Sequence, residues 1–111
     1  MKIDDWRRKI DAIDTALLHL LNLRAELALE VGRMKKEEGV ALRAPMRERE
    51  ILRRMKSLNP GPLDGEAIGK IYLCLLAESI RMQELDGCGK AASAKGNRGA
   101  SRRKRRKPGR S

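Results

Sequence analysis

The residues of this sequence that could do chemistry are polar side chains inserted into apolar helical stripes, and Arg24 is the first of them. Apolar residues recur at alternating intervals of three and four along the N-terminal segment, which predicts one packed face of a long helix. These residues are Ile3, Trp6, Ile10, Ile13, Leu17, Leu20, Leu27, Val31 and Met34. Arg24 interrupts this series where the spacing predicts an apolar residue. Because an unpaired buried charge costs several kcal/mol, Arg24 should meet an anion, either from its own fold or from a ligand.

The other apolar stripes of the chain carry similar polar inserts. Eleven residues after Arg24, about three helical turns, a second cation falls on the same helix face. The further inserts are Lys35 in this first segment, Arg47 and Glu48 before Ile51, and Ser79 and Gln83 at the end of the last stripe. Three helical segments, each with a polar insert and with cations in excess, predict a buried pocket for a small anion.

A purely structural interpretation of the same residues is also open. Arg24 could form an internal salt bridge with Glu48. Lys35 could extend its amine into solvent at a helix end. Ser79 and Gln83 could be exposed positions in a frayed terminal turn.

The segments that carry these residues are predicted to be helical throughout, which gives an all-α fold class. We expect helices over about residues 4–38, 45–58 and 64–86. Gly39 supplies a stop for the first helix, and Pro45 sits where a helix favours its first residue. Asp64 can cap the third helix after the break "NPGP".

The predicted lengths suggest how the helices assemble. The first helix would be a rod of roughly 50 Å, and two shorter helices turning back cannot cover all of its apolar stripe. We therefore expect two chains to pack their long helices together, as an intertwined six-helix homodimer of three-helix chains.

Charge divides the chain into a domain of residues 1–86 and a tail of residues 87–111. The domain carries 16 basic and 15 acidic residues, whereas the tail carries 10 basic residues and no acidic one. The tail lacks periodicity and is predicted to be disordered. Its run "SRRKRRK" could bind nucleic acid by charge, although no aromatic residue is present in it for base stacking.

Several classes of protein are disfavoured by what the sequence contains. No apolar run approaches the ~18 residues of a membrane span, so we expect no membrane partner. Cys74 and Cys88 have no metal-binding spacing and are expected to be reduced thiols in a cytoplasmic protein. The single His19 has no second ligand nearby in the pattern, so we expect no metal and no cofactor.

Three blocks of this sequence resemble the all-helical chorismate mutases. They are "RRKIDAIDTALLHLLNLRAELALEVGRMK", "RERE" and "ESIRMQ", at the spacing of that family, and the resemblance covers about residues 3–86. It implies an intertwined homodimer with two active sites that convert chorismate to prephenate, the branch step toward phenylalanine and tyrosine. Arg24 would then lie on the apolar stripe because a substrate carboxylate is its partner.

The resemblance also implies a role for each polar insert. Arg24 and Ser79 would bind carboxylate groups of chorismate, and Arg7 would reach into the site of the partner chain. Lys35 and Gln83 would donate hydrogen bonds to the ether oxygen of the breaking bond. Glu48 would accept a hydrogen bond from the ring hydroxyl, and Arg47 would add positive charge and orient Glu48.

One position departs from the family pattern. Ala44 stands where many members have an acidic residue, so one contact to the substrate hydroxyl is missing, although a backbone N–H could replace it. The loss of one hydrogen bond would weaken binding by roughly 1 kcal/mol.

Two other functions stay open beside the mutase. An isochorismate-pyruvate lyase would use a similar cationic pocket. A non-enzymatic helical dimer that binds nucleic acid through its tail is the other alternative.

Overall fold

The computed structural model describes the backbone of residues 1–93 and the side chains of residues 1–86. This part of the chain forms three α-helices and no strand: α1 (Ile3–Glu38), α2 (Pro45–Leu58) and α3 (Gly65–Ser93). The all-α fold class and the three helices expected from the sequence are thereby confirmed.

The helix ends follow from the local signals in the sequence. α1 ends at Gly39, whose φ of 73° lies in the left-handed region, where a residue without a Cβ is favoured. Pro45 is the first residue of α2. The Asp64 carboxylate caps α3 by accepting a hydrogen bond from the backbone N–H of Ala67 at 2.8 Å.

α3 is longer than the sequence pattern predicts. We expected it to end near Asp86, where the apolar periodicity stops, but the helix continues to Ser93. Residues 87–93 contain no proline, and each residue added to an existing helix gains a backbone hydrogen bond without the cost of nucleation. The rest of the predicted disordered tail lies outside the described residues.

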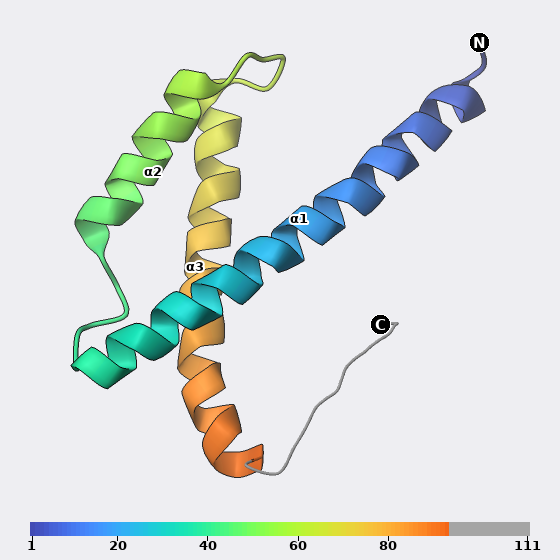
Figure 1. Cartoon of the computed structure of the whole chain (residues 1–111). Helices are drawn as coiled ribbons and strands as arrows, with labels where there is room; N and C mark the ends of the chain where they lie inside the picture. The colour runs from blue at the N-terminus through green and yellow to red at the C-terminus, as the bar shows by residue number, and fades with distance from the viewer. Residues whose placement is uncertain (94–111) are drawn as a thin grey trace.

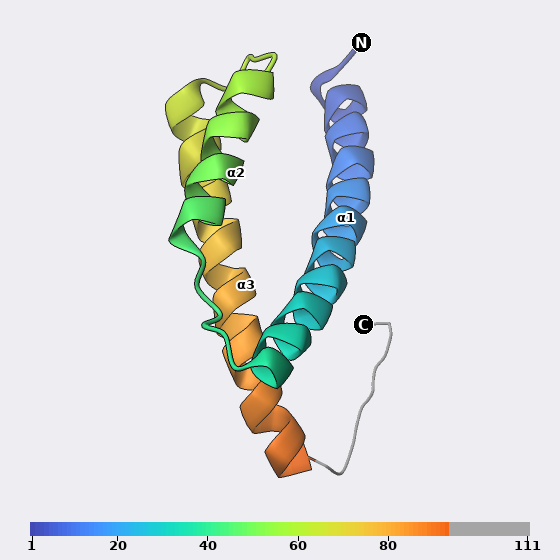
Figure 2. The same cartoon turned by 60° about the vertical axis from the view of Figure 1, so that its left-hand side comes forward.

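α3 is the helix that organises the other two, because it packs against both α1 and α2. α2 and α3 run side by side, and α1 crosses α3 with the C-terminal half of its length (Figure 1). In the second view α1 forms one arm of a V and the α2–α3 pair forms the other (Figure 2). The N-terminal half of α1 therefore extends beyond the other helices.

Few apolar side chains are buried within the single chain. Ile51 is the one large apolar side chain in residues 1–86 that is buried, at 8% exposure. Along α1 the apolar stripe is open to solvent, with Trp6 at 54%, Leu17 at 51% and Leu20 at 61% exposure. α2 and α3 thus leave the rod largely uncovered, as its length predicted. None of the helices in the described part of the chain has the length and the low charge needed to cross a bilayer.

Candidate active site

A cavity of about 270 Å³ lies where the three helices approach one another. Its apolar walls come from Leu27 and Val31 of α1, Ile51 of α2, and Leu76 and Ile80 of α3. Its polar lining consists of Arg24, Lys35, Arg47, Glu48, Ser79 and Gln83. The cavity therefore brings together every polar insert that the helical stripes predicted, from positions far apart in the sequence.

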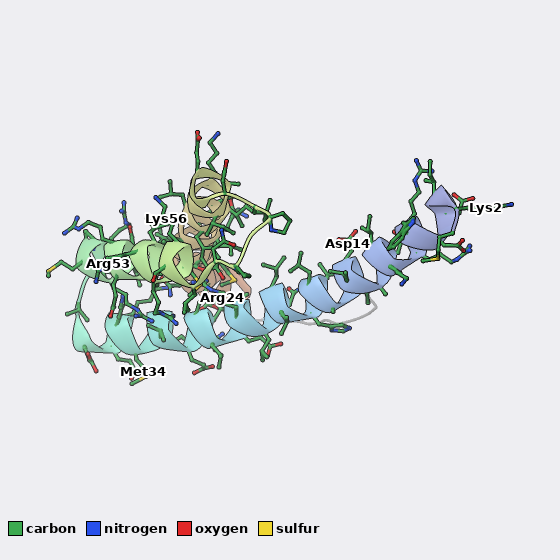
Figure 3. The ribbon with its side chains drawn as sticks, turned by 90° about the horizontal axis from the view of Figure 1, so that it is seen from above. Lys2, Asp14, Arg24, Met34, Arg53 and Lys56 are labelled. Atoms are coloured by element: carbon green, nitrogen blue, oxygen red, sulfur yellow. The ribbon has the colours of Figure 1, made fainter. Side chains whose placement is uncertain are left out.

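Arg24 extends from α1 toward α3. Its Nη1 donates a hydrogen bond to Ser79 Oγ at 2.9 Å. Figure 3 shows Arg24 on the part of α1 that lies beside α2 and α3, whereas Lys2 and Asp14 lie on the part that extends beyond them. A salt bridge between Arg24 and Glu48, the structural alternative, is absent from the described residues, because Glu48 is paired elsewhere.

Arg43, in the connection between α1 and α2, is the partner of Glu48. Arg43 Nε donates to Glu48 Oε2 at 2.9 Å and Nη2 donates to Oε1 at 2.7 Å. These two bonds hold the pKa of the Glu48 carboxyl below its usual value, against the opposing effect of burial. The same pairing raises the pKa of the Arg43 guanidinium.

The expectation that Arg47 orients Glu48 is wrong in this structure. Arg47 pairs with Glu50, Nη1 to Oε1 at 2.8 Å. Residues three apart are neighbours on a helix surface, whereas adjacent residues such as Arg47 and Glu48 point about 100° apart. Arg47 still lines the cavity.

Lys35 is half-buried at the C-terminal end of α1. Its Nζ donates to the backbone oxygen of Leu42 at 2.9 Å, so the amine bonds within the fold and does not extend freely into solvent. With Arg24 and Arg47 it gives the cavity three cations against the single carboxylate of Glu48, which Arg43 already neutralises. This balance favours an anionic ligand.

Gln83 is the most constrained of the lining side chains. It is 5% exposed, and its Nε2 donates to the backbone oxygen of Ala28 at 2.6 Å. Its own backbone oxygen accepts a hydrogen bond from Lys36 Nζ. Its Oε1 is buried and has no partner among the described residues. Ser79 is half-buried as well, so the interpretation of these two residues as a frayed, exposed turn is wrong.

Gly32 of α1 makes room for Gln83. A Cβ added at Gly32 would lie 2.7 Å from Gln83 Cγ and 3.0 Å from Cδ. Gly32 is the single glycine within α1, and a glycine inside a helix costs about 1 kcal/mol relative to alanine. A glycine at this cost indicates close packing, and this signal is present in the sequence alone.

An ion pair next to the cavity joins the C-terminal parts of α1 and α3. Arg33 Nε donates to Asp86 Oδ2 at 3.1 Å, and Arg33 Nη1 pairs with Glu30 at 2.6 Å. The hydrogen bond from Arg33 to Asp86 is the main cause of the raised pKa of Arg33. This pair holds the two helices together one turn beyond Gln83, and no sequence spacing indicated it.

Arg7 lies apart from all of these residues. It is on the exposed N-terminal part of α1, where its Nη1 approaches Asp4 Oδ1 at 3.8 Å. It does not line the cavity of its own chain. Arg7 and Arg24 are seventeen residues apart, about 25 Å along α1, so the two side chains cannot meet within one chain.

The chemistry available in the cavity is binding and charge stabilisation. Its apolar walls can hold a small ring, its cations can bind carboxylates, and the Lys35 amine and Gln83 amide can donate hydrogen bonds. Glu48, with its lowered pKa, is an acceptor. No group of three or more His, Cys, Asp or Glu side chains that could hold a metal ion occurs in the described part of the chain.

Comparison with known proteins gives one consistent result. The family model for chorismate mutase type II matches residues 6–84. A bifunctional chorismate mutase/prephenate dehydratase of Neisseria gonorrhoeae is 38% identical over 77 residues, which are 69% of this chain and 21% of that protein. A chorismate mutase of Methanocaldococcus jannaschii is 33% identical over 84 residues, which are 75% of this chain and 85% of that protein.

A solved structure agrees with these sequences. The structure of chorismate mutase (form II) from Thermus thermophilus superposes with a TM-score of 0.74 at 32% identity, over 76% of this chain and 96% of that one. The bifunctional relatives are much longer, and this chain spans between a fifth and a quarter of the length of those in Neisseria gonorrhoeae and Aquifex aeolicus.

Proposed function

The chain belongs to the chorismate mutase type II family, and from this premise we propose that its cavity converts chorismate to prephenate. The observation that carries the proposal is the gathering of three cations and two uncharged polar side chains, from three helices, around one cavity with apolar walls. Chorismate is a dicarboxylate built on a small ring, which matches both the excess positive charge and the apolar surface.

The reaction needs no group that the cavity lacks. It is a concerted [3,3] shift in which the ether C–O bond breaks as a C–C bond forms within the same molecule. No nucleophile and no proton transfer are required, so catalysis must come from holding the compact conformer and from stabilising charge on the ether oxygen.

We assign each lining side chain a role that its functional group can perform. Arg24 and Ser79, whose Nη1 and Oγ atoms are 2.9 Å apart, would bind one substrate carboxylate together. Arg47 would add positive charge for the second. Lys35 and Gln83 would donate to the ether oxygen, where a charged donor contributes more than a neutral one.

Glu48 would accept a hydrogen bond from the ring hydroxyl, since its lowered pKa keeps it ionised. Ala44 lines the cavity beside it but offers no side-chain acceptor. One acceptor in place of two predicts weaker substrate binding by roughly 1 kcal/mol and does not predict loss of the reaction.

We also propose that two chains form an intertwined six-helix homodimer. The exposed apolar stripe on α1 is too extensive for a chain that stays single in water. If the N-terminal arm of the partner's α1 covered the cavity, it would carry Arg7 toward a substrate carboxylate, which explains why this arginine lies outside the cavity of its own chain.

The product of the reaction would enter the route to phenylalanine and tyrosine. Such a role suits the cytoplasm, where we place the protein.

The test is direct. The purified chain should consume chorismate, followed by the loss of its absorbance, and yield prephenate without added metal or cofactor. Release of pyruvate from isochorismate, with chorismate unchanged, would replace the mutase assignment with a lyase.

A further inference from the structure

We propose that Arg43 is a positioning residue that holds the Glu48 carboxylate ionised and in one orientation at the edge of the chorismate cavity. The inference rests on the proposed function and adds a residue to it. Arg43 itself does not line that cavity, so it would act on the substrate through Glu48 alone.

The geometry of the pair is the first support. Two different nitrogens of Arg43 bond to the two different oxygens of Glu48, at 2.9 and 2.7 Å. A single hydrogen bond leaves a carboxylate free to rotate, whereas this two-pronged pairing fixes its plane. Glu48 is 20% exposed, which leaves it accessible to a ligand on one side.

The two cavities on either side of Glu48 give the second support. A separate cavity of about 250 Å³ is lined by Arg43 and Glu48 together with apolar residues of α3. Glu48 lines both cavities, and Arg43 lines this second one only. The guanidinium therefore pairs with Glu48 from outside the lining of the chorismate cavity.

The place of Arg43 in the chain gives the third support for the inference. It immediately precedes Ala44, the N-cap of α2, which forms no side-chain capping bond. Its neighbour Leu42 accepts the hydrogen bond of Lys35. Two consecutive residues of this connection thus hold one cation and one carboxylate of the site, although neither contact has the spacing of a helical pair.

The charges around Glu48 determine what the loss of Arg43 would do. Arg43 in the connection is the main cause of its lowered pKa, and Lys35 of α1 contributes. Arg24 of α1 and Arg47 of α2 line the same cavity, while α3 offers it only uncharged side chains. Removing Arg43 takes away the strongest of these effects, so that burial, which raises the pKa of Glu48, is opposed only by weaker effects such as the charge of Lys35.

The experiment is a pH–rate profile of the full chain with Arg43→Gln. Near pH 7 we expect kcat/KM to fall on the order of tenfold, because the acceptor loses its orientation. The acidic limb of the profile should also move to higher pH, since Glu48 would protonate more readily. Arg43→Lys keeps the positive charge but not the two-pronged pairing. Relative to Arg43→Gln, it should return the acidic limb toward its wild-type pH while kcat/KM stays low.

Arg81→Gln is the matched control. Arg81 pairs with Glu78 at 2.7 Å and its side chain is 63% exposed, the same fraction as Arg43, but it does not line the chorismate cavity. We expect this variant to have the wild-type profile. Thermal melts of all variants separate a loss of folding from a loss of positioning.

Two further measurements make the outcome decisive. In a Glu48→Gln background, Arg43→Gln should have no further effect on kcat/KM, and a full additional loss would overturn the inference. Titration of the ¹³C-labelled Glu48 carboxyl by NMR should show a higher pKa in Arg43→Gln, and an unchanged titration would also overturn it. If the wild-type chain leaves chorismate intact, the proposed function fails, while this titration still decides whether Arg43 controls Glu48.

Discussion

Gly32→Ala should change the free energy of unfolding through two opposing effects, and the structure gives the sign of each. An alanine inside a helix is favoured over glycine by about 1 kcal/mol, so the change should stabilise α1 if nothing stood in the way. At this position, however, the new Cβ would lie 2.7 Å from Gln83 Cγ, 3.0 Å from Cδ and 3.1 Å from Cβ. Real carbon contacts are not that short, so the Gln83 side chain or α3 must move.

The cost of that movement exceeds the gain. Overpacking a close contact costs roughly 1–3 kcal/mol. Displacing Gln83 also breaks the bond from its Nε2 to the oxygen of Ala28, worth roughly 1–3 kcal/mol when a buried group loses its partner. Against a gain of about 1 kcal/mol, we expect a net destabilisation on the order of 1–5 kcal/mol.

Activity should fall more than stability alone explains. If Gln83 donates to the ether oxygen, an error of about 1 Å in its place removes a donor from the developing charge, and kcat should drop at least roughly tenfold. The assays are chemical denaturation for stability and chorismate turnover for kcat, under conditions in which the variant is fully folded.

Gly69→Ala is the control within the same chain. Its new Cβ would meet Lys56 Cε at 2.9 Å, but this is the far end of a flexible side chain that can swing away. The helix gain should therefore survive, with a stability equal to wild type or up to about 1 kcal/mol higher. A Gly32→Ala variant that behaved like Gly69→Ala, with unchanged kcat, would refute the view that Gly32 holds Gln83 in place.

Three other outcomes are expected. Gln83→Glu should be active at low pH, where the buried carboxylic acid can donate a hydrogen bond. Activity should fall as the pH rises through the pKa of this carboxyl, which burial raises. A pH–rate profile of wild-type shape would show that Gln83 does not bind the ether oxygen. Arg7→Ala and Arg24→Ala should each be nearly inactive, yet a heterodimer of the two should regain one of its two sites; confirmed heterodimers without activity would refute composite sites. Truncation after Ser93, the end of α3, should leave turnover intact, and a large fall would show that residues 94–111 serve the reaction.

The sequence by itself determined the helices and the polar inserts. Gly39, Pro45 and Asp64 act through backbone conformation and capping within a few residues, so their effects are local and readable without a fold. The α3 end was misjudged because apolar periodicity reports burial, whereas a helix can continue beyond the buried part.

The gathering of the inserts around one cavity was also predictable. A polar residue at a stripe position is fixed in direction by the helical repeat, so Arg24, Lys35 and Gln83 had to face the same interior as the apolar residues around them. The residues that hold these side chains were not predictable, because each bond depends on where another element passes. Arg43 reaches Glu48 across a helix start, and Ala28 and Gly32 meet Gln83 from about fifty residues away in the sequence.

The surface that packs on the exposed apolar stripe of α1 is decided by contacts beyond the single chain. The periodicity of α1 identifies an apolar face. The hydrophobic effect favours covering this face but does not specify which surface covers it. Within one chain α3 packs against the C-terminal half of α1 but leaves most of the apolar stripe, and Arg7, exposed to solvent. The sequence therefore determined that this arginine is outside its own cavity, and only the packing of complete chains decides which anion it meets.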